Sequence, residues 1–184
     1  MDVKSKILQW KGEIDQESID IYKFLQKQFP IDDNIFRFVY RSFYGLDNAG
    51  LSEECKQEYF GLFKKRETSL QKILEALYHF KTRKGFNTYQ FSFATKLIHT
   101  IDNNAPIYDS KVHKLFKFPP RKKEIKWCIN TYNLLKEKYA SLLQDNQVQQ
   151  RIKELKEKYS TQDLSDTKML DFILWTIGKE EEKK

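Results

Sequence analysis

A lysine and an aspartate thirteen positions apart, Lys96 and Asp109, are the residues of this 184-residue chain whose types and spacing best fit covalent chemistry. The lysine lies in FSFATKLIHT (91–100), and the aspartate follows in PIYDSKV (106–112). The intervening NNAP (103–106) breaks the helical pattern and reverses the chain, so Asp109 is expected to return toward Lys96. A lysine amine withdrawn from water is neutral more often and attacks carbon, and a nearby carboxylate stabilises positive charge or relays protons.

A structural interpretation of the same residues stays open. Lys96 would then be a solvated lysine on a basic helix, and Asp109 would cap the next short helix, since aspartate is among the best N-cap residues. Lys96, His99 and Thr100 are three and four positions apart, so we expect all three on one helix face. His99 and Tyr108 are the candidates for lining a pocket, and Tyr108, next to Asp109, is expected to face the site.

The chain before Lys96 predicts a helix-hairpin-helix element. Helical periodicity runs from Thr68 to Thr82, a basic turn with Gly85 ends that helix, and Ser92 begins the next one. The free amides and the dipole at the start of the second helix favour an anion. We therefore expect a phosphate seat there and DNA contacts from Arg83, Lys84, Ser92, Thr95, Lys111 and Lys114.

Basic residues are concentrated in the centre of the chain. The whole chain carries a net charge of +7, and the segment 81–126 holds eleven basic residues against three acidic ones. Such a basic centre is expected where phosphates are neutralised. A solvated lysine-rich surface is the alternative explanation.

Two stretches, SFATKL (92–97) and PIYDS (106–110), resemble the helix-hairpin-helix DNA glycosylases, in particular the 8-oxoguanine type. In that family a lysine at the start of the second hairpin helix is followed by an aspartate after a short proline-containing segment. The resemblance implies that Lys96 is a Schiff-base nucleophile and that Asp109 is the catalytic carboxylate. It also implies that a base is flipped out of the duplex into an aromatic pocket, with no metal or organic cofactor.

Apolar residues at helical spacing predict an all-α fold, with 1–184 as a single-domain bundle of about eight to ten helices. A weak boundary near 143–149 would set off a C-terminal helical pair at 147–178. Two further segments, RSFYGLD (41–47) and DFILW (171–175), look like motifs without an assigned chemistry, and we interpret them as loop and core packing. Tyr44 and Trp127 either line a pocket or fill the core.

Several function classes lack their signatures. There is no glycine-rich phosphate loop, no His-Glu-x-x-His and no Gly-x-Ser-x-Gly. Cys55 and Cys128 have no metal-ligand spacing, so we expect no metal site and reduced thiols in a cytoplasmic protein. No apolar run approaches the ~20 residues that span a bilayer, so no membrane partner is expected.

Three functions follow from these features. The first is a DNA-lesion glycosylase, acting on an 8-oxoguanine-like base through Lys96 and Asp109, or a diverged relative of one. The second is a non-catalytic helix-hairpin-helix module in which Lys96, Lys111 and Lys114 bind DNA electrostatically. The third is an all-helical protein-interaction module.

Overall fold

The computed structural model describes residues 2–29 and 33–182, and within these ranges it is all-helical, as the sequence predicts. None of the helices in these ranges has both the length and the apolar character needed to cross a membrane. A short 3-10 turn spans Asp47–Ala49. The α-helices are α1 Val3–Gln9, α2 Gln16–Gln28, α3 Asn34–Tyr44, α4 Glu53–Lys64, α5 Leu70–Tyr78, α6 Phe91–Ile101, α7 Ser110–Leu115, α8 Ile125–Leu143, α9 Asn146–Tyr159 and α10 Asp166–Glu181.

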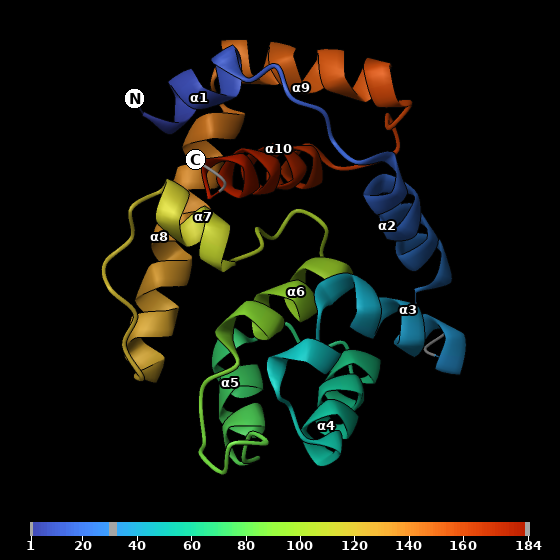
Figure 1. The fold of residues 1–184 in the computed structure, drawn as a ribbon, viewed down its shortest axis with the longest axis vertical. Coiled ribbons are helices and arrows are strands. Elements are labelled where there is room, and N and C mark those ends of the chain that lie inside the picture. Colours follow the sequence, from blue (N-terminus) through green and yellow to red (C-terminus); the bar gives the residue numbers. More distant parts are fainter. Residues whose placement is uncertain (1, 30–32, 183–184) are drawn as a thin grey trace.

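The helices form two groups that meet at α6, α7 and α10 (Figure 1). At one end of the molecule α1 and α9 cover α10, and at the other end α3, α4, α5 and α6 pack together, with α8 along one side. Helix α10 packs against α1, α7, α8 and α9, so the predicted C-terminal pair is tied to elements from three other parts of the chain. Large rings fill the interior, and the hydroxyls of Tyr40 and Tyr59 join α3 to α4 at 2.8 Å.

Local sequence signals explain most helix starts. Ser52 and Ser165 cap α4 and α10, and Asp109 caps α7 by accepting from the amides of Lys111 and Val112. Serine and aspartate are favoured at this position, and the cap predicted at Asp109 is confirmed.

The start of α6 was predicted incorrectly. The helix begins at Phe91, and its N-cap is Gln90, which makes no side-chain cap, so Ser92 lies inside the helix. Helix α5 ends at Tyr78 instead of Thr82, because Asn87 Nδ2 donates to the Tyr78 carbonyl at 2.6 Å and holds the connecting segment against the helix end. The segment 79–90 is thus longer than expected, and its identity as the hairpin of a helix-hairpin-helix stays a prediction.

Two close contacts fix the position of α7 and of Asp109 in front of it. A Cβ on Gly178 would lie 2.7 Å from Cβ of Lys111, so the glycine lets α10 approach α7 closely. On the other side, Oγ1 of Thr95 in α6 accepts from the Tyr108 amide at 3.0 Å. Asp109 is therefore held between α6 and α10.

His99 lies in the core, which corrects its prediction as a pocket residue. It is 0% exposed, and its Nδ1 donates to the Ala105 carbonyl at 2.6 Å, so its Nε2 accepts from the Tyr22 hydroxyl at 2.9 Å. Burial lowers the pKa of His99 to about 4. The unfolded chain binds this proton at the ordinary pKa, so the stabilisation is complete above about pH 6.5 and is lost as the pH falls toward 4.

We expect the free energy of unfolding to fall by about 2 kcal/mol between pH 7.5 and pH 5 through His99 alone. Urea unfolding at the two pH values measures the effect. A His99→Gln variant is the control, because it removes the titrating group and should show a correspondingly smaller fall. An equal fall in the variant would contradict the assignment.

Candidate functional site

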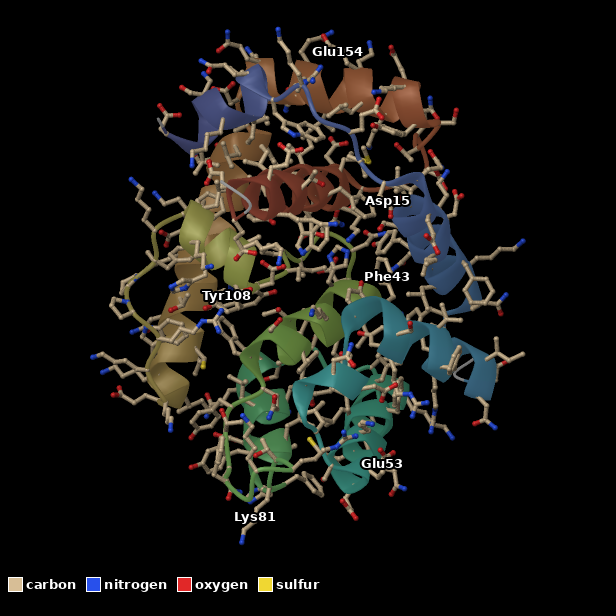
Figure 2. All side chains as sticks on the ribbon, viewed as in Figure 1. Asp15, Phe43, Glu53, Lys81, Tyr108 and Glu154 are labelled. Atoms are coloured by element: carbon tan, nitrogen blue, oxygen red, sulfur yellow. The ribbon has the colours of Figure 1, made fainter. Side chains whose placement is uncertain are left out.

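Lys96 and Asp109 line one cavity of about 230 Å³ at the junction of the two helix groups. Its walls come from the end of α3, from α6, from the segment before α7, from α10 and from the chain before α2. In Figure 2, Asp15 and Phe43 mark the side of this cavity toward α2 and α3. The cavity is lined by Glu13, Ile14, Asp15, Ser18, Phe43, Tyr44, Lys96, Ile107, Asp109, Lys168, Asp171, Phe172, Trp175, Thr176 and Lys179.

The amine of Lys96 is largely withdrawn from water. Its Nζ donates to the Tyr44 carbonyl at 3.1 Å and lies over the ring of Phe93, 4.9 Å from the centroid. Burial lowers the pKa of Lys96 to about 8, against the opposing attraction of Asp109. At pH 7 the neutral amine is therefore about 300 times more abundant than for a lysine with the ordinary pKa.

The carboxyl of Asp109 caps α7 with only one of its two oxygens. Its Oδ1 accepts from the amides of Lys111 and Val112 at 2.8 and 2.9 Å. Burial raises the pKa of Asp109, with a smaller opposing effect from the Val112 amide. Oδ2 is not used by the cap, so the same residue both starts α7 and lines the cavity with one oxygen uncommitted to the helix.

The two motif-like segments, interpreted from the sequence as loop and core packing, supply five of the fifteen residues that line the cavity. The segment 41–47 contributes Phe43 and Tyr44, and the segment 171–175 contributes Asp171, Phe172 and Trp175. Four aromatic side chains thus surround the lysine and the aspartate. A wall of this kind suits a flat ring, and polar groups at a few positions orient it.

Lys168 was missed by the sequence analysis and lies on the same wall. It is 2% exposed and forms a 2.7 Å ion pair with Asp171, three residues later on α10. The detectable signal was a lysine and an aspartate at i, i+3 in a helix that is otherwise apolar nearly all round, because charged residues are rarely buried unless they are paired.

Tyr108 lines a pocket, as predicted, but Thr95 is not placed for its predicted DNA contact. Thr95 is 0% exposed and hydrogen-bonds the Tyr108 backbone, so it cannot contact DNA directly. Tyr108 lies to the left of Phe43 in the view of Figure 2 and lines a second cavity. Its hydroxyl is 2.9 Å from Nδ1 of His113.

The second cavity, of about 370 Å³, lies at the start of α6, where a phosphate seat was expected. Its basic residues are Arg121, Lys122 and Lys123, all exposed, from the segment before α8. The guanidinium of Arg121 lies over the ring of Tyr108, 5.7 Å from the centroid. Arg83 and Lys84 are exposed but are not among the lining residues, so the basic group at this helix end differs from the predicted one.

Lys111 and Lys114 are both engaged by the C-terminal end of α10. Their Nζ atoms lie 3.5 and 2.7 Å from the carboxylate oxygens of Glu182. Nζ of Lys111 also lies over the ring of Trp175, 5.4 Å from the centroid. Of the predicted DNA contacts, these two are therefore partly neutralised.

Within residues 2–29 and 33–182, no group of three or more His, Cys, Asp or Glu side chains is arranged to hold a metal ion. No protein-family model, curated protein or solved structure matches this chain. The geometry of the two cavities is therefore the basis for inferring a function.

Proposed function

We propose that this protein is a DNA-lesion glycosylase, acting on an 8-oxoguanine-like base with Lys96 as the nucleophile and Asp109 as the catalytic carboxylate. The observation that carries the proposal is that a desolvated lysine, its pKa lowered to about 8, shares an aromatic-walled cavity with the half-buried carboxyl of Asp109. A lysine that serves only as a solvated surface charge would not be desolvated in this way.

The proposed reaction begins when the neutral amine of Lys96 attacks C1′ of a flipped-out nucleotide. The N–C1′ bond forms as the glycosidic bond breaks, and the bonding electrons leave with the base. Asp109 stabilises the positive charge that develops on the sugar, and the proton lost by the amine passes to the departing base. Opening of the sugar ring then gives an imine between Lys96 and the sugar.

Borohydride trapping tests the proposal directly, because it reduces the imine to a stable amine bond. The protein is incubated with duplexes that carry 8-oxoguanine, uracil or an abasic site, and the adduct is mapped by peptide mass spectrometry. We expect one adduct, on Lys96. An adduct spread over surface lysines would reject the assignment, because abasic sites trap stray lysines. DNA retention without any adduct would favour the non-catalytic binding module.

The basic group at the start of α6 supports DNA as the partner. The first amides of α6 have no side-chain cap, and the positive end of the helix dipole lies beside Arg121, Lys122 and Lys123. This cavity and the lysine cavity both border α6, the first at residues 91–93 and the second at Lys96.

We expect the double substitution Arg121→Gln/Lys122→Gln to weaken DNA binding at all sequences and to reduce the slope of log K against log salt by about two. Fluorescence anisotropy over a salt series measures the slope. Arg83→Gln/Lys84→Gln, with the same change in charge, is the matched comparison and should leave the slope nearly unchanged. The reverse result would place the phosphate contact at the segment 79–90.

A further inference from the structure

The buried ion pair on the cavity wall has no evident structural purpose. Nζ of Lys168 lies 2.7 Å from Oδ2 of Asp171, and both side chains line the cavity of Lys96. The rings of Tyr22 and Phe172 flank the ammonium, with centroids 4.4 and 4.1 Å from Nζ. A buried pair of this kind contributes little net stability, because removing two charges from water costs about as much as their attraction returns.

We propose that Lys168 and Asp171 form a positioning pair, which makes Lys96, rather than Lys168, the cavity amine that bonds to an electrophilic carbon. This inference deepens the proposed function and rests on it. Nζ of Lys168 is occupied by the carboxylate of Asp171 and lies over two rings, so it is not presented to a substrate carbon. Lys96 donates to a neutral carbonyl instead, which holds its proton less firmly.

The charged groups around Lys96 predict the direction in which each substitution shifts the pKa of Lys96. Burial has the largest effect on the pKa of Lys96 and lowers it; Asp109 and Asp171 raise it, and Lys168 and Lys111 lower it. Removing the charge of Asp171 should therefore lower the pKa of Lys96, and removing the charge of Lys168 should raise it. The other titratable side chains that line the cavity are Glu13, Asp15, Tyr44 and Lys179.

Trace labelling with acetic anhydride tests the inference without DNA. The native protein is labelled briefly from about pH 6 to about pH 10, and acetylation of Lys96 and of Lys168 is measured by peptide mass spectrometry. In the wild-type protein, Lys96 should be labelled with a midpoint near its pKa of about 8. Lys168 should be labelled at least about tenfold more slowly. Equal labelling of the two lysines would overturn the proposal, whether or not any variant folds.

Two single variants then test the direction of the effect. Lys168→Gln should raise the labelling midpoint of Lys96 by roughly one pH unit, and Asp171→Asn should lower it by a similar amount. In Asp171→Asn, labelling of Lys168 should also increase. A change in the same direction in both variants, or no change in either, would overturn the proposal.

Controls separate this inference from a loss of structure and from the proposed function. Lys156→Gln and Asp166→Asn, which break an ion pair between α9 and α10, should leave the midpoint of Lys96 unchanged. Circular dichroism checks that each variant is folded. Loss of the predicted shifts with DNA trapping intact would reject the positioning pair alone. The predicted shifts without any DNA adduct would reject the glycosylase alone.

Discussion

The substitution Lys96→Met should abolish the borohydride-trapped adduct and reduce base release by at least roughly a thousandfold. Methionine has nearly the length of lysine and fills the same space, but it has no amine with which to attack C1′. The contacts with the rings of Tyr44 and Phe93 are apolar enough to accept it. Base release measured under single-turnover conditions, with DNA in deficit, reports the chemical step without the contribution of product release.

The same variant should be at least as stable as the wild-type protein. The pKa of Lys96 is lowered on folding, so the protonated lysine opposes folding at pH 7, and its removal should raise the free energy of unfolding by about 1–3 kcal/mol. Lys136→Met on α8 is the matched control, since Lys136 is exposed and its Nζ also lies over a ring, 5.3 Å from the centroid of Tyr132. An active Lys96→Met would reject lysine catalysis, and a strongly destabilised one would assign Lys96 a structural role.

The substitution Asp109→Asn should reduce base release by roughly 10²–10⁴-fold and leave stability nearly unchanged. Asparagine is as good an N-cap as aspartate, so its side-chain oxygen can still accept from the amides of Lys111 and Val112. It cannot stabilise the positive charge on the sugar or relay the proton. The variant therefore separates the two interpretations of Asp109, because a residue that only caps α7 would tolerate it.

Asp145 provides the matched control for this experiment. Its Oδ1 caps α9 by accepting from the amides of Gln147 and Val148, which is the same geometry as at Asp109, but outside the cavity. Asp145→Asn should leave base release unchanged. Full activity in Asp109→Asn, measured beside this control and with thermal unfolding as the check on the fold, would remove Asp109 from the reaction.

The all-helical class followed from the sequence because its signals are local. Apolar spacing reports which face of a helix is buried, and a cap depends on amides two or three residues away, so the cap at Asp109 was identified correctly. Where a distant group took part, prediction failed. The end of α5 depends on Asn87, nine residues beyond Tyr78, and α1 was not predicted because only Ile7 in it is buried.

The pairing of Lys96 with Asp109 was also within reach of the sequence, since the break at 103–106 reverses the chain between them. The rest of the cavity was decided by packing between distant elements. Whether Phe43, Asp171 or Trp175 fills the core or lines a cavity depends on how α3 and α10 meet α6, and periodicity cannot specify that. His99 and Thr95 were instead expected at a pocket or at DNA, but both are completely buried although they share α6 with Lys96.

The basic residues show the same division between what the local sequence indicates and what tertiary packing determines. Sequence composition located the basic centre of the chain, but exposure and pairing decide which of its charges can meet a phosphate. Helix α10 brings Glu182 to Lys111 and Lys114, and the segment before α8 brings Arg121 to the start of α6. Desolvation of Lys96 likewise needs walls from several distant elements, because burial is a property of everything that surrounds an atom. Local pattern thus identified the proposed reactive pair, and tertiary packing determined its environment.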